Sequence, residues 1–106
     1  QEAIEHLDNF KSDDANVAPI AKGAIGDAFA QLDQQEDALK YYESAASMSS
    51  SELTSPRFLL KAGITAIGLG KSDVALKHFN TIIDNYPNSP EATKAILYQG
   101  KAEAMQ

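Results

Sequence analysis

Several residue types on which common functions depend are absent or scarce in this sequence. It contains no cysteine, which excludes disulfide bonds and thiolate metal sites. Its two histidines, His6 and His78, lie in separate segments with no histidine or carboxylate at ligand spacing, so we interpret both as surface side chains. No serine, histidine and aspartate set and no carboxylate pair converges in the sequence. We therefore expect no enzymatic activity, no cofactor and no metal ion.

Basic residues are also few. Lysine and arginine number 9 against 15 aspartates and glutamates, which gives a net charge of −6 at pH 7. A nucleic-acid backbone or an anionic membrane surface would repel such a chain, so neither is expected as its main partner. The acidic surface is interpreted as a means of keeping the domain soluble rather than as a binding face.

Long apolar runs are missing as well. No stretch approaches the ~20 residues that a membrane-spanning helix needs, and the sequence does not open with a signal-peptide pattern. Because the chain starts at Gln1 rather than at a methionine, we expect it to be a piece of a longer protein. Any membrane association would then come through a missing N-terminal anchor.

One short motif resembles part of a nucleotide-binding loop. Gly70, Lys71 and Ser72 match the end of the phosphate-binding P-loop, but the glycine required five residues before Gly70 is Thr65. The motif also follows a predicted helix, whereas a P-loop follows a strand. The end of one helix and the start of the next explain these three residues, so nucleotide binding is not expected.

What the sequence does contain is helical periodicity along its whole length. Apolar residues recur every three to four positions and no strand pattern occurs, which predicts an all-α domain of about six helices. The expected helices are 2–11, 17–32, 36–47, 56–69, 73–85 and 90–104. A chain of 106 residues allows one modest domain.

Helix boundaries are marked by capping residues. Gly70 is expected to end its helix in the left-handed conformation. Side-chain oxygens that are expected to cap the starts of helices belong to Asp13, Asp14, Asn16, Ser55, Ser72 and Ser89.

The two middle helix pairs repeat each other. Gly26 and Gly63, Ala38 and Ala75, and Tyr42 and Phe79 are each 37 residues apart. With a glycine at the turn (Gly70) and a closing proline (Pro87), this pattern resembles the tetratricopeptide repeat. The first unit departs from the pattern, since Asp33 stands at the turn-glycine position and Ser50 at the proline position.

The resemblance implies an architecture. Antiparallel helix pairs would stack into a right-handed superhelix with the first helix of each pair on its concave side. The expected division is a half repeat at 1–14, repeats at 15–51 and 52–88, and a closing helix at 89–106. The first helix would lack its upstream partner.

A narrower resemblance concerns residues 85–104. This segment is similar to tetratricopeptide proteins of the bacterial envelope, including membrane-anchored partners of the secretion translocon and lipoproteins of outer-membrane assembly. The resemblance implies a bacterial cell-envelope location, membrane-anchored in the full-length chain.

A candidate binding groove follows from the same family. Its ligand-facing positions, carried onto this chain, are Asp27, Gln31, Arg57, Leu60, Ile64, Ile67, Lys94, Leu97 and Lys101. Leu60, Ile64 and Ile67 form a helical stripe separate from the one that should face the neighbouring helix. Either neighbouring helices already cover this stripe, or it is open to a peptide, a second protomer or the missing N-terminal segment.

These features predict a non-catalytic scaffold for protein–protein interaction, with a protein or peptide as its partner. The alternative is a structural role, in which the chain is a self-associating segment of an envelope assembly.

Overall fold

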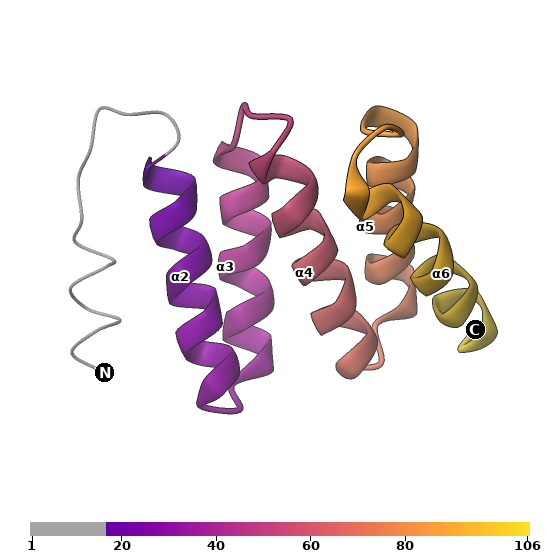
Figure 1. Ribbon diagram of the computed structural model, residues 1–106. Coiled ribbons are helices and arrows are strands. Elements are labelled where there is room, and N and C mark those ends of the chain that lie inside the picture. Colours follow the sequence, from indigo (N-terminus) through magenta and orange to yellow (C-terminus); the bar gives the residue numbers. More distant parts are fainter. Residues whose placement is uncertain (1–16) are drawn as a thin grey trace.

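The computed structural model describes residues 17–106, which form five α-helices and no strand (Figure 1). The helices are α2 (Val17–Gln31), α3 (Gln35–Met48), α4 (Thr54–Gly68), α5 (Ser72–Asn85) and α6 (Pro90–Ala104). The all-α prediction is confirmed, and the predicted limits of these five helices agree with the structure to within two residues. The helix expected at 2–11, His6 and the caps expected at Asp13, Asp14 and Asn16 lie outside the described residues.

The helices stack in chain order. Each one packs on the next, and two further contacts join α2 to α4 and α4 to α6. Figure 1 shows α2 to α5 side by side, with α6 closing the row beyond them. Because the connections are short, consecutive helices run antiparallel, as in a helical repeat. None of these helices is both long and apolar enough to span a bilayer.

Glycines on two helices admit an aromatic ring from the helix that follows. A β-carbon added at Gly26 would lie 2.7 Å from Tyr42 Cε1, and one added at Gly63 would lie 2.4 Å from Phe79 Cε1. Both approaches are too close for any side chain, so only glycine permits them. We call such a position a glycine notch. It is a glycine in one helix against which an aromatic ring of the next helix packs.

The turns after α2 and α4 are also equivalent. Asp33 has φ 60° and Gly70 has φ 75°, so both residues are left-handed. In each turn the backbone amide of the following residue, Gln34 or Lys71, donates a hydrogen bond of 2.9 Å to a carbonyl of the preceding helix. Gly70 is confirmed as the left-handed end of its helix. Asp33 adopts the same conformation without being glycine, which a short polar side chain tolerates.

The cap predictions are only partly right. Ser89 is confirmed, since its side chain accepts a hydrogen bond from the Ala92 amide at 3.2 Å. Ser55 and Ser72 were expected to precede their helices, and this is wrong: α4 begins at Thr54 and α5 begins at Ser72. Neither helix start has a side-chain cap. Ser55 is buried and accepts a hydrogen bond from the Tyr86 hydroxyl at 3.1 Å, so its oxygen serves a contact between helices instead.

Candidate functional site

A groove opens between α4 and α6, which are in direct contact. Its volume is about 550 Å³. It is lined by Leu60, Ile64, Lys94, Leu97, Tyr98 and Lys101. We call it the α4–α6 groove. All of these residues except Tyr98 were expected to face a ligand.

The floor of the groove is apolar and partly open. Leu60 is 8% exposed, Ile64 is 38% exposed and Leu97 is 73% exposed. Leu60 and Ile64 lie one turn apart on α4, and Leu97 faces them from α6. The described helices therefore cover Leu60, whereas Ile64 and Leu97 remain in contact with solvent.

The rim of the groove is basic. Lys94 and Lys101 are exposed and lie two turns apart on the same side of α6. No acidic residue lines the groove, and neither lysine pairs with an acidic group within residues 17–106. In a chain of net charge −6 this rim is a local region of positive potential.

Tyr98 is the groove residue that sequence reasoning missed. Its ring stacks on Phe79, with centroids 5.8 Å apart and planes 20° apart, and it also lines the groove. Its place directly after Leu97, and three residues before Lys101, was the available signal.

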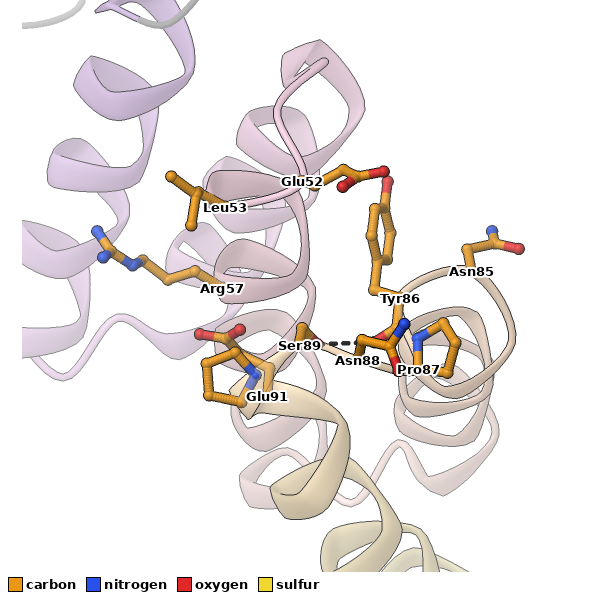
Figure 2. A pocket seen from close by; sticks show the side chains of 10 residues that line it. Glu52, Leu53, Arg57, Asn85, Tyr86, Pro87, Asn88, Ser89 and Glu91 are labelled. Atoms are coloured by element: carbon orange, nitrogen blue, oxygen red, sulfur yellow. Dashed lines mark hydrogen bonds between the residues drawn. The ribbon is translucent and has the colours of Figure 1, made fainter.

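Three other expected residues lie elsewhere. Ile67 packs against the core and does not line the groove, and Gln31 is exposed at the end of α2. Arg57 lines a second hollow of about 440 Å³ beside the 86–89 connection. Figure 2 shows Arg57 and Leu53 on one side of this hollow and Tyr86 and Pro87 on the other.

Asp27, the remaining expected residue, is held by internal partners. The Tyr42 hydroxyl donates to Asp27 Oδ1 at 2.5 Å, and Lys61 Nζ donates to the same oxygen at 2.9 Å. The three side chains join α2, α3 and α4 at one point. The carboxylate is therefore engaged in joining helices, away from the residues that line the α4–α6 groove.

The same contact perturbs Tyr42. Burial, followed by the hydrogen bond to Asp27 and the negative charge of that carboxylate, raises the pKa of the Tyr42 hydroxyl. A neutral tyrosine is thus strongly favoured in the folded protein.

This shift predicts a loss of stability in alkaline solution. The pKa of Tyr42 is higher in the folded state than in the unfolded chain, where it is about 10. The contribution of Tyr42 to the free energy of unfolding is therefore fully present below about pH 10 and is lost as the pH rises beyond it. Urea unfolding of the parent and of Tyr42→Phe should show their difference in unfolding free energy shrinking above about pH 10. A difference that stays constant across this range would contradict the prediction.

Comparison with known proteins identifies part of the chain. Residues 58–89 match the family model of the tetratricopeptide repeat. No curated protein and no solved structure gives a significant match. The matched segment holds the landmarks Gly63, Gly70, Ala75, Phe79 and Pro87, on which the resemblance rests. Residues 58–89, which cover most of α4 and all of α5, are therefore similar to a tetratricopeptide repeat.

Proposed function

We propose that this chain is a non-catalytic interaction module that binds a segment of another protein in the α4–α6 groove. Tetratricopeptide repeats generally mediate protein–protein interactions through the concave surface of a helix stack. One observation supports this site in particular. The apolar side chains of Ile64 and Leu97 are exposed to solvent between Lys94 and Lys101.

The groove favours a particular kind of ligand. An apolar floor suits a helix or extended segment with aliphatic side chains, each worth at most ~1.5–3 kcal/mol on burial. Ordering of the ligand offsets a good part of this gain, so the expected affinity is roughly micromolar. The two lysines favour acidic residues beside the apolar ones.

We further propose that the chain is divided into repeats at 15–51 and 52–88, followed by a closing helix at 89–106. Support comes from equal spacings: the left-handed residues Asp33 and Gly70, like the notches at Gly26 and Gly63, are 37 residues apart. The cellular setting that we propose, a bacterial cell-envelope assembly, rests only on the likeness of residues 85–104 noted above.

Self-association is the second candidate function. One observation favours it: Ile96 and Leu97 on α6 are exposed, as is Met105 directly after the end of that helix. Sedimentation at increasing protein concentration separates the two candidates, since an interaction module without its ligand should stay monomeric.

The groove can be tested by selecting binding segments from a peptide display library. We expect apolar peptides with acidic flanks, whose affinity falls about tenfold or more with Leu97→Lys, because a buried aliphatic contact is lost and a charge is placed on the floor. Leu97 is 73% exposed, so the variant should fold like the parent.

The matched control is Ile96→Lys, which changes an exposed apolar residue on another side of the same helix and should leave this binding unchanged. Ile64→Lys, on the α4 side of the groove, should lower the peptide affinity in the same way. Selected peptides that bind both Leu97→Lys and Ile64→Lys as tightly as the parent would show that the ligand uses a different face.

A further inference from the structure

The two lysines of the α4–α6 groove are spaced like residues on one face of a helix. Lys94 and Lys101 are seven residues apart on α6, which is about two turns and a rise of about 10.5 Å. Leu97 lies between them and lines the same groove. Neither lysine forms an ion pair within residues 17–106. A ligand that pairs with both therefore needs two acidic groups at a similar distance from each other.

The same spacing already joins two other helices of this protein. Glu36 and Glu43 are seven residues apart on α3, and their partners are Lys71, directly before α5, and His78 within it. Lys71 Nζ lies 3.0 Å from Glu36 Oε2, and His78 Nε2 lies 2.6 Å from Glu43 Oε2. Two acidic residues seven apart on one helix can thus contact two basic side chains that are seven apart on another chain segment.

These two contacts bridge helices that do not pack on each other. Within residues 17–106, α3 and α5 each pack on α4, and they are not in direct backbone contact. They run in the same direction, because each is antiparallel to α4. Long charged side chains therefore suffice to hold one helix in register with another that lies beside it.

The apolar floor of the groove fits the same kind of ligand. When two acidic residues are seven apart on a helix, the third and fourth positions after the first acid lie on the same face as both. Aliphatic side chains at these two positions would face Ile64 and Leu97, which are exposed. One face of a single helix would thus meet both the lysines and the floor.

An extended ligand matches the lysines less well. Side chains on one face of a strand are about 7 Å or about 13 Å apart. Neither distance equals the about 10.5 Å between the two lysine positions along α6. Only one acidic residue of an extended segment can therefore lie directly opposite a lysine at a time.

A second copy of the chain does not supply such a helix. Only two pairs of acidic residues in the whole sequence are seven apart. Glu36 and Glu43 already have partners, and Leu39 between them is buried. Asp84 and Glu91 lie on different helices. The acidic helix must therefore come from a different protein.

We propose that the ligand of the α4–α6 groove is an amphipathic helix of a different protein. It carries two acidic residues seven apart, with aliphatic residues at the third and fourth positions after the first acid. Lys94 and Lys101 each pair with one acid, and Ile64 and Leu97 contact the aliphatic side chains. This inference rests on the proposed function of the groove and adds the conformation and the spacing of its ligand.

Three synthetic peptides test the spacing and the conformation. The first has the pattern Glu-x-x-Leu-Leu-x-x-Glu in an alanine-rich host of about 18 residues, which is long enough for partial helicity. The second has the same composition, but its second glutamate stands five residues after the first and so points to another face. The third is the first with a proline on the side away from the leucines, which breaks the helix.

Each peptide is titrated into the isotope-labelled 106-residue chain at up to about 1 mM. The first should shift the backbone amide signals of Leu60, Ile64 and Leu97. The second should bind about two- to fivefold more weakly, because one exposed ion pair is lost, and added salt should reduce the difference. The third should bind at least about fivefold more weakly, because a broken helix must be ordered on binding.

Charge reversal tests which groups pair. Lys94→Glu and Lys101→Glu change exposed residues, so both variants should fold, and each should bind the first peptide more weakly than the parent does. A peptide with lysine in place of one glutamate should regain affinity for only one of the two variants, and this also gives the direction of the bound helix. The matched control is Lys77→Glu, which reverses an exposed lysine outside the groove and should leave the affinity nearly unchanged.

The inference is overturned if the three peptides bind the groove equally, or if the lysine-substituted peptide does not distinguish Lys94→Glu from Lys101→Glu. The proposed function stands in both cases, since the amide shifts still place a ligand in the groove. The inference alone also fails if no designed peptide binds, while peptides selected by display do bind and depend on Leu97. Selected peptides that are insensitive to both Leu97→Lys and Ile64→Lys would overturn the proposed function as well.

Discussion

Replacing Phe79 by alanine is expected to lower the free energy of unfolding by about 3–5 kcal/mol. The Phe79 ring is completely buried. It fills the notch at Gly63 on one side and stacks on Tyr98 on the other, so its removal leaves a cavity between α4, α5 and α6. A loss of this size is a large part of the roughly 5–15 kcal/mol that stabilises a small domain.

Thermal and urea unfolding monitored by helicity measure this effect. Phe79→Leu, which keeps most of the apolar volume, should lose clearly less than Phe79→Ala. Because Tyr98 also lines the α4–α6 groove, the alanine variant should weaken ligand binding there even at temperatures where it remains folded. Superimposable melting curves for Phe79→Ala and the parent would mean that the ring does not fill the core position assigned to it.

Alanine substitutions at Gly63 and Gly100 are expected to change stability in opposite directions. At Gly63 the new β-carbon would lie 2.4 Å from a buried ring, and such overpacking costs about 1–3 kcal/mol. That cost exceeds the about 0.5–1 kcal/mol that alanine gains over glycine within a helix. At Gly100 the β-carbon meets nothing, so only the gain remains.

The pair is informative because the chemical change is identical. Gly63→Ala should melt below the parent and Gly100→Ala above it, with about 4–8 °C for each kcal/mol in a domain of this size. If both variants melted above the parent, Phe79 would have room to move away from α4. If both melted below it, the outer face of α6 would be covered in solution.

The fold was predictable because its signals are local. Helical periodicity, the left-handed turn at Gly70 and the start of α6 at Ser89 depend on residues within a few positions of one another. The notches at Gly26 and Gly63 could also be inferred from the sequence, since the glycine and the aromatic residue that packs on it recur at the same spacing in both helix pairs. The segment that matches the family model contains the second of these notches.

What the sequence could not predict involves contacts between distant residues. Asp27 was expected to face a ligand, yet its partner Lys61 is 34 residues away on α4. Ser55 was expected to cap a helix, yet it bonds to Tyr86, 31 residues later. In both cases two possible roles existed for one polar side chain, and only the packing of the helices decided between them. Five of the nine residues expected to face a ligand line the α4–α6 groove, because these positions follow the repeat, whereas Arg57 lines the other pocket.

Each helix packs mainly on its neighbours in the chain, and this affects how the protein folds and unfolds. Contacts between segments close in sequence require only short loops to close, which places such a chain among those that fold in microseconds to milliseconds. Unfolding is correspondingly progressive, because separating α2 and α3 from the stack breaks contacts with α4 but none between α4, α5 and α6. If a protease cuts the 49–53 connection and α2 and α3 then separate from α4, the α4–α6 groove retains both of its walls.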